Sequence, residues 1–369
     1  MKIIHIISSF SPGGAEILVK KLAIALSLKN QVEVWAIAQS KDEPFARKFK
    51  QELHQNQVKM FQFYKPYHRK RFSIILELRR KIKESKPDII NTHLEYINLF
   101  TIMATLGLPI PLVHTVHNIK IDHIGAYRYL FKYFNRRFIA ISEKVKKTIE
   151  KQLKVSSEKV NLIYNGVNIE TFYNPQRKER KTVNHIIAVG RLTRQKDYPN
   201  LLKAYKALLG LLSPYHTQPP QLNIVGEGEL RKDLMEWVKK LEITPQVNFL
   251  GIRDDIPRLL AQNDLYVLSS RWEGFSISLI EALAAGMPVI ATAVGSSDEI
   301  VYNYNNGLLV PPGQPDLLAK AIFKLIMQKE LRAKLAGNGP EIAKKFNLKA
   351  CAEGYLALYR DIYESISRK

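Results

Sequence analysis

Short apolar runs recur along the chain and alternate with stretches whose apolar residues return every three or four positions. Runs of four to seven residues rich in Ile, Val and Leu predict strands buried on both faces, as in a parallel sheet. The longer stretches predict amphipathic helices, such as the one near Phe72 with Ile75, Leu78 and Ile82 along one stripe. This alternation predicts an α/β fold built from βαβ units. The predicted strands occupy residues 1–7, 32–37, 86–93, 112–118, 138–141, 185–189, 222–226, 247–251, 265–268 and 289–292.

A polar, basic segment without periodicity interrupts the alternation at residues 174–184. Because 369 residues exceed the size of one ordinary core, a division of the chain is expected there. We predict an N-terminal Rossmann-like domain at 1–172, a linker at 173–184 and a second Rossmann-like domain at 185–345. The remaining segment, 346–369, predicts a long C-terminal helix.

Residues 265–300 carry the strongest chemical signal. A strand turns through Gly274 into a helix that begins near Ile277, and the chain then returns as a parallel strand. The start of such a helix presents unpaired N–H groups and the positive end of a dipole, which together favour an anion. Ser276 is predicted to be the N-cap, with its hydroxyl accepting a hydrogen bond from an N–H of the first turn.

Two carboxylates, Glu273 and Glu281, flank this helix start. Negative charge beside an anion site is reasonable if each carboxylate accepts hydrogen bonds from hydroxyls of the same ligand. A nucleotide sugar offers a diphosphate for the helix and hydroxyls for the acids. Taken alone, two glutamates at this spacing are more often an ordinary turn residue, here Glu273, and an exposed helix residue, here Glu281.

Composition favours a soluble globular protein, with 46% hydrophobic and 24% charged residues. No run of about 20 apolar residues is present, and the N-terminus reads as a first strand, so we expect a cytoplasmic protein. The single cysteine, Cys351, excludes an internal disulfide and a thiolate metal cluster, in agreement with a reducing compartment.

The formal net charge of +22 is distributed unevenly. Residues 1–172 hold 29 Lys and Arg against 14 Asp and Glu. Such an excess attracts an anionic membrane surface or a phosphorylated acceptor, and a basic surface that is merely solvated is the alternative. The basic and aromatic residues between Phe61 and Arg71 suit a nucleobase, an acceptor or a membrane equally well. We do not expect nucleic acid to be the partner.

The segment EGFSISLIEALAAGMPVIAT, residues 273–292, resembles the donor-site signature of glycosyltransferase family 4. These are retaining sugar transferases with two Rossmann-like domains whose parallel sheets face an interdomain cleft, the glycosyltransferase-B fold. The signature combines two glutamates separated by seven residues with a small-Gly-x-Pro-Val-x-Ala turn. Ser276 departs from it, since the family often has glycine there. The resemblance spans nearly the whole chain and is strongest at residues 190–310.

Further motifs carry the same resemblance. Gly190, Arg191 and Lys196 match a Gly-Arg-x-x-x-x-Lys motif whose bases clamp the donor diphosphate. His117 matches a histidine that contacts the donor sugar, while His93 and Glu95 are weaker acceptor-side candidates. The resemblance implies catalytic roles for Glu273, His117, Arg191 and Lys196, and donor binding by Gly14, Arg191, Lys196, Gly226, Glu273, Phe275, Ser276, Ile277 and Glu281.

The resemblance implies transfer of a hexosyl unit, with retention, from a nucleoside diphosphate sugar to a glycan or polyprenyl-linked acceptor in surface polysaccharide or glycolipid assembly. The first domain would bind the acceptor and the second the donor, with the C-terminal helix packing back on the first. A UDP-sugar is favoured over a GDP-sugar, and no cofactor or metal is expected, because Asp254-Asp255 reads as a helix start. The alternatives are a non-catalytic relative that binds nucleotide sugars and a sugar-nucleotide isomerase of the same fold.

Overall fold

The computed structural model describes residues 1–11, 13–38, 44–63, 71–119, 124–173, 182–216 and 218–367. Two compact units result: unit 1 comprises Met1–Gly166 and Leu348–Lys369, and unit 2 comprises Val167–Asn347. We predicted the division after residue 172. By its internal contacts, unit 2 begins at Val167, which bridges to Asn347 at the other end of the same unit. Most of the predicted linker and of the stretch between Phe61 and Arg71 lies outside the described residues.

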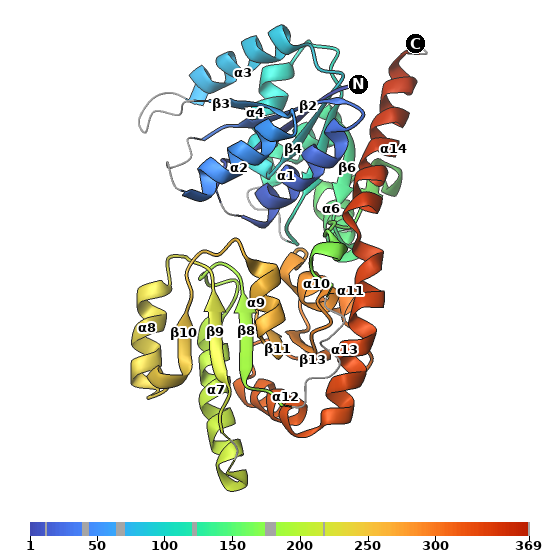
Figure 1. Ribbon diagram of the computed structural model, residues 1–369. Helices are drawn as coiled ribbons and strands as arrows, with labels where there is room; N and C mark the ends of the chain where they lie inside the picture. The colour runs from blue at the N-terminus through green and yellow to red at the C-terminus, as the bar shows by residue number, and fades with distance from the viewer. Residues whose placement is uncertain are drawn as a thin grey trace. The chain divides into compact units, whose positions relative to one another are not determined.

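Unit 1 contains, within its described residues, a seven-stranded sheet in the order β3-β2-β1-β4-β5-β6-β7 (Figure 1). Every pairing is parallel, so the carboxyl ends of the strands meet at one edge. The chain order reverses between β1 and β4. The strands are β1 (Lys2–Ile7), β2 (Gln31–Ala36), β3 (Lys59–Gln62), β4 (Ile89–His93), β5 (Leu112–Val116), β6 (Asn135–Ala140) and β7 (Val160–Leu162).

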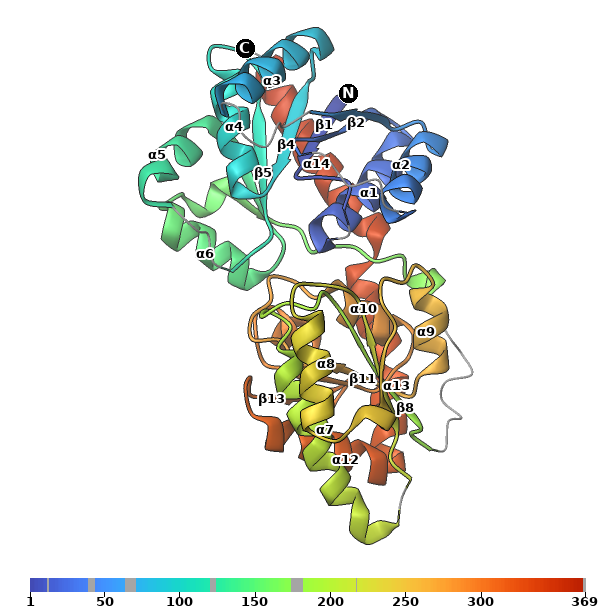
Figure 2. The same ribbon diagram turned by 90° about the vertical axis from the view of Figure 1, so that its left-hand side faces the viewer.

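Helices cover both faces of this sheet (Figure 2). One face packs against α1 (Gly14–Ser27), α2 (Pro44–Gln55) and α14 (Leu348–Ser367). The other is covered by α3 (Arg71–Ser85), α4 (Glu95–Thr105), α5 (Ile124–Phe134) and α6 (Glu143–Leu153).

The C-terminal helix α14 belongs to the core of unit 1. Tyr355 and Tyr359 are fully buried in the cluster formed with α1 and the sheet. Asn91 on β4 donates through Nδ2 to the Tyr359 hydroxyl at 2.7 Å, and this pair is buried. A satisfied polar contact of this kind fixes the helix on the sheet, since an unpaired buried amide would be destabilising.

Unit 2 contains, within its described residues, a six-stranded parallel sheet in the order β10-β9-β8-β11-β12-β13. The strands are β8 (His185–Val189), β9 (Gln221–Val225), β10 (Val247–Phe249), β11 (Leu265–Leu268), β12 (Val289–Thr292) and β13 (Leu308–Val310). The main apolar core lies between the sheet and α7 (Tyr198–Leu212), α8 (Arg231–Lys240) and α12 (Pro315–Met327). Further helices are α9 (Ile256–Gln262), α10 (Ile277–Ala284), α11 (Ser297–Ile300) and α13 (Lys329–Ala343).

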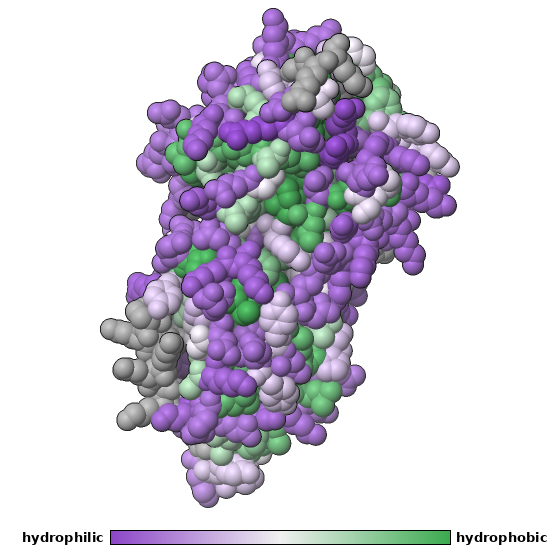
Figure 3. All heavy atoms as spheres, turned by 90° about the vertical axis from the view of Figure 1, so that its right-hand side faces the viewer, coloured by the Kyte–Doolittle hydropathy of each residue, from purple (hydrophilic) through white to green (hydrophobic). Residues whose placement is uncertain are grey.

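Short 3-10 helices occupy the connections η1 (Ser157–Lys159), η2 (Ile169–Thr171), η4 (Ser213–Tyr215), η5 (Thr244–Gln246) and η6 (Lys344–Phe346). None of the helices in the described ranges combines the length and apolarity needed to cross a membrane. Hydrophilic residues predominate on the face shown in Figure 3, where apolar residues form separate patches.

Candidate active site

The chain order of the unit 2 sheet reverses between β8 and β11, and the loops that follow these two strands lie against each other. Ser269 Oγ donates to the Lys196 carbonyl at 2.8 Å, and Arg271 N donates to the Gln195 carbonyl at 2.8 Å. Open α/β sheets bind ligands at the carboxyl edge of such a reversal. The predicted bases and the first predicted glutamate are therefore brought to one edge of the sheet.

Lys196 and Glu273 form an ion pair at this edge. Lys196 Nζ lies 2.5 Å from Glu273 Oε1, and Ser270 Oγ donates to the same carboxylate oxygen at 2.6 Å. The Glu273 side chain is only 4% exposed. Glu273 is therefore a buried carboxylate with the partners that burial requires, rather than an ordinary turn residue.

Glu281 is also buried, on helix α10, so the interpretation of this residue as an exposed helix position is wrong. Hydrogen bonds anchor α10 to the strands beneath it. The Tyr266 hydroxyl donates to Ser278 Oγ at 2.8 Å, and Ser278 Oγ donates to the Val189 carbonyl at 3.2 Å. Burial raises the pKa of Tyr266 well above its usual value, so Tyr266 remains a neutral donor.

Ser276 occupies the N-cap position of α10, but its predicted side-chain cap is wrong. Its backbone has φ −91° and ψ 97°, and its side chain accepts no capping hydrogen bond. Ser142, which does cap α6, has φ −159° and ψ 163° and accepts from Val145 N at 3.2 Å. Among the residues that the structure describes, no partner lies within hydrogen-bonding distance of the buried Ser276 hydroxyl. The Ser276 side chain therefore does not cap the first-turn N–H groups of α10.

Two glycines allow a close approach of the loops at this edge. Gly226 has φ +134°, and a Cβ atom there would lie 2.0 Å from the Gly190 carbonyl oxygen. A Cβ atom on Gly190 would lie 2.9 Å from Lys196 Cε. Arg191 follows directly in the same loop and is exposed. A larger residue at 226 would clash with the backbone of the loop that carries both bases, whereas one at 190 would push against the Lys196 side chain.

The remaining residues predicted to bind the sugar donor differ in burial and in the unit to which they belong. Phe275 is buried and packs on Phe346 with ring centroids 5.6 Å apart, and Ile277 is the half-buried first residue of α10. Gly14 lies in unit 1 as the exposed first residue of α1, where a side chain would meet nothing within 4 Å. The geometry at position 14 therefore does not require glycine. The predicted helix start at Asp254-Asp255 is confirmed, because Asp255 is the N-cap of α9.

His117 follows β5 in unit 1 and is the outer member of a row of histidines. Its Nε2 lies 2.9 Å from Nδ1 of His93, and His93 Nε2 lies 3.1 Å from Nδ1 of His5. Burial lowers the pKa of His117 to about 4 and that of His5 to about 3. All three rings are therefore neutral near pH 7, since burial also holds the pKa of His93 well below its usual value.

Comparisons with known proteins agree with this chemistry. Residues 170–342 match the model for glycosyl transferases group 1, and residues 12–171 match the model for Glycosyltransferase Family 4. A glycosyltransferase of Methanocaldococcus jannaschii is 31% identical over 268 residues, which cover 70% of each chain. The chain is a family 4, group 1 glycosyltransferase.

A second relative aligns with this chain over almost its whole length. A Campylobacter jejuni protein is 28% identical over 372 residues, or 98% of this chain and 99% of that protein. Its name describes an alpha-1,4-N-acetyl-D-galactosaminyltransferase whose substrate is a saccharide on PP-undecaprenol.

The solved structure of Anabaena HepE in complex with UDP-glucose has the same fold. It has a TM-score of 0.81 at 23% identity, with both chains covered completely. The two parallel-sheet α/β units of the glycosyltransferase thus have the predicted glycosyltransferase-B fold.

Sequence reasoning missed several polar residues that support the site. Gln195 donates through Nε2 to the Trp272 carbonyl at 3.2 Å, and Asp197 Oδ2 lies 2.9 Å from Arg271 Nε. Asp197 also has φ +47°, which is unusual for a residue other than glycine. Their signal in the sequence is weak, because these contacts join loops more than 70 residues apart.

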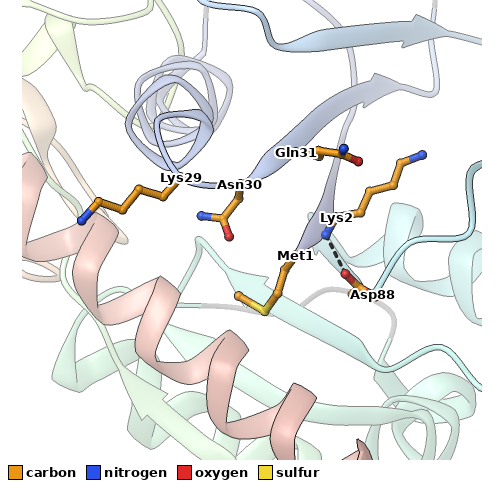
Figure 4. A pocket seen from close by; sticks show the side chains of 6 residues that line it. All are labelled: Met1, Lys2, Lys29, Asn30, Gln31 and Asp88. Atoms are coloured by element: carbon orange, nitrogen blue, oxygen red, sulfur yellow. Dashed lines mark hydrogen bonds between the residues drawn. The ribbon is translucent and has the colours of Figure 1, made fainter.

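An open pocket in unit 1 does not coincide with any of these residues. It lies at the amino ends of β1 and β2, where Lys2 N donates to Asp88 Oδ2 at 2.7 Å (Figure 4). The glycosyltransferase signature residues lie instead at carboxyl edges of strands. The pocket is therefore separate from the candidate site.

Proposed function

We propose that this glycosyltransferase moves a hexosyl unit from a UDP-sugar to a hydroxyl of a glycan or polyprenyl-linked acceptor, with retention of the anomeric configuration. The observation that carries the proposal is the Lys196–Glu273 pair beside the start of α10, which the Ser276 side chain does not cap. The UDP-glucose bound by HepE supports the donor, and the undecaprenol-linked substrate of the Campylobacter relative supports the acceptor and a role in surface polysaccharide or glycolipid assembly.

The donor diphosphate binds to Arg191, Lys196 and the first-turn N–H groups of α10. These groups place positive charge where the diphosphate leaves, so they stabilise the transition state more than the bound donor. Each charge-assisted hydrogen bond contributes about 1.5 to 3 kcal/mol. No metal is needed for this step, because the same cations and amides neutralise the departing charge.

The two glutamates hold hydroxyls of the donor. Glu281 accepts from the ribose diol, and Glu273 accepts from the hexose. Glu273 Oε1 already binds Lys196 and Ser270, whereas the hydrogen bond found for Oε2 among the described residues is a long one, 3.4 Å from Gln195 Nε2. Oε2 is therefore the oxygen that receives the sugar hydroxyl. The match of His117 to the family's histidine supports a sugar-contacting role for this residue of unit 1.

Transfer takes place on the front face of the sugar. The bond between the anomeric carbon and the diphosphate oxygen breaks, and the acceptor oxygen forms its bond to the same face of that carbon. The acceptor proton passes to the departing diphosphate oxygen, so neither glutamate is required as a nucleophile. The anomeric configuration is retained because both bonds share one face.

The basic first unit also favours peripheral binding to an anionic membrane. On α3, the exposed Phe72 and Leu76 lie one turn apart and are 71% and 67% exposed. Arg80 and Lys83 continue the exposed surface of the same helix. Apolar residues followed by bases suit the boundary between acyl chains and anionic headgroups. This surface would bring the enzyme to a lipid-linked acceptor.

Calorimetric titration with UDP and GDP tests the donor site. We expect UDP to bind more tightly than GDP, and we expect Lys196→Ala and Glu281→Ala each to weaken UDP binding by about tenfold or more. Lys232→Ala and Glu236→Ala, at exposed positions on α8, are matched controls and should bind like the parent. If Lys196→Ala and Glu281→Ala also bind like the parent, the assigned donor site is wrong.

A further inference from the structure

Three neutral histidines form a continuous row in unit 1, from the middle of its sheet toward the surface. His5 on β1 is fully buried, His93 at the end of β4 is 1% exposed, and His117 after β5 is half-buried. Adjacent rings are tilted by 32° and joined by nitrogen–nitrogen contacts of 3.1 and 2.9 Å. These distances are those of N–H···N hydrogen bonds, and a neutral imidazole has one donor and one acceptor nitrogen. The row therefore has one direction of donation.

The inner end of the row decides that direction. If donation ran inward from His117, His5 would carry its proton on Nε2. Among the described residues, no hydrogen-bond partner reaches His5 Nε2, which is buried. A buried N–H donor without a partner is rarer and more costly than an unused acceptor lone pair. Donation outward from His5 Nδ1 leaves only an unused lone pair.

We infer that His5 and His93 are positioning residues that fix His117 as the Nδ1–H tautomer. His5 Nδ1–H donates to His93 Nε2, and His93 Nδ1–H donates to His117 Nε2. The lone pair of His117 Nε2 is then occupied, and Nδ1–H is the nitrogen left for a ligand. His117 therefore offers substrate a hydrogen-bond donor and cannot act as a base.

The backbone beside His93 supports a functional reason for this arrangement. Leu94 joins His93 to helix α4 with φ +82° and ψ 144°, a conformation rarely adopted by a bulky residue. Strained backbone of this kind clusters at active sites and ligand-binding positions. The lowered pKa values of His5, His93 and His117 agree with a row that holds no charge.

The inference deepens the proposed function and rests on it for the identity of the ligand. The Nδ1–H group of His117 can donate a hydrogen bond to an oxygen of the transferred sugar. It also explains why the acceptor proton leaves with the diphosphate, since His117 has no free lone pair to receive it. The tautomer itself depends only on the free protein.

Nitrogen-15 NMR of the histidine-labelled full-length protein tests the tautomer directly, without any ligand. We expect His117 and His93 to carry their protons on Nδ1 at pH 7.5, with signals assigned from His117→Gln and His93→Asn. Protonation of His117 on Nε2 in the parent protein would overturn the inference. This result holds whether or not the protein binds UDP.

Two variants of similar shape test the positioning role. Asn at position 93 keeps an N–H donor near the place of the ring Nδ1, whereas Leu removes it. We expect His93→Leu to lower affinity for UDP-glucose about tenfold and to lose the single His117 tautomer. His93→Asn should stay within about threefold of the parent. Both should bind UDP like the parent, because UDP lacks the hexose that His117 would contact.

Equal losses of UDP-glucose affinity in the Asn and Leu variants would mean that His93 only supports packing, and would refute the positioning role. A parent protein that binds neither UDP nor UDP-glucose would refute the proposed function instead. The NMR measurement separates these two failures.

Discussion

Glu273 and Lys196 stand 77 positions apart in the sequence and form the closest ion pair of the candidate site. Neither side chain is more than 15% exposed. Their attraction is therefore weakly screened, and each charge depends on the other for compensation. The pair holds an ammonium group at the edge of the sheet before any donor arrives.

A double-mutant cycle measures this dependence. We expect Glu273→Gln to lower the free energy of urea unfolding by roughly 3 kcal/mol, because it leaves the Lys196 charge without its partner. Adding Lys196→Met should recover at least about 1 kcal/mol relative to the sum of the single changes. Strict additivity would contradict a coupled pair. Glu341→Gln breaks an exposed pair with Lys344 and should leave stability nearly unchanged.

The buried histidines make unit 1 sensitive to acid. Burial lowers the pKa of His5 and His114 to about 3, below the value near 6.5 expected after unfolding. Below about pH 6.5, the unfolded chain binds more protons at these histidines than the folded chain does. Stability is therefore complete above about pH 6.5 and falls as the pH decreases toward the folded pKa. Each such histidine contributes a loss of roughly 2 kcal/mol between pH 7 and pH 5.

Urea unfolding at several pH values, followed by fluorescence of the buried Trp35, checks this expectation in a Trp237→Phe/Trp272→Phe background. His5→Asn should reduce the slope of stability against pH by about 1.4 kcal/mol per pH unit. His54→Gln, at an exposed position on α2, should leave the slope unchanged. A slope that is the same in all three proteins would show that His5 is not neutralised by folding.

At the scale of elements, the loops after β8 and β9 depend on glycine for their close approach. Gly226→Ala combines an unfavourable φ with a clash against the Gly190 carbonyl, so we expect a loss of at least about 2 kcal/mol in unfolding free energy. Gly210→Ala in α7 meets nothing within 4 Å and should stabilise by about 0.5–1 kcal/mol. Equal effects of these two changes in urea unfolding would contradict the packing argument.

Most elements could be predicted from sequence, because buried parallel strands read as apolar runs and the turns between elements carry glycine. The Ser276 cap could not, since Ser142 and Ser276 both precede helices and differ in backbone φ and ψ, which the sequence does not show. The contacts among His5, His93 and His117 were also missed. They depend on β1 lying beside β4, which in turn pairs with β5, and sequence spacing does not show these pairings.

The charge of the whole molecule gives a test of membrane binding. We expect sedimentation to show binding to phosphatidylglycerol vesicles that weakens as salt rises, because exposed charges are screened. Arg80→Glu/Lys83→Glu on α3 should weaken binding at least tenfold. Lys232→Glu/Lys240→Glu on α8 makes the same change in net charge and should have a smaller effect. Equal effects would refute a lipid-binding role for α3.

The residues of unit 1 come from both ends of the sequence, with β1 near the start and α14 after all of unit 2. During synthesis on the ribosome, the first 166 residues emerge without the helix that buries Tyr359 against Asn91. Unit 2 is contiguous and is complete before α14 has been translated. Unit 2 can therefore finish folding before unit 1. Until Leu348–Ser367 leaves the exit tunnel, the N-terminal part of unit 1 exposes the apolar surface that α14 will cover, and chaperones can bind there.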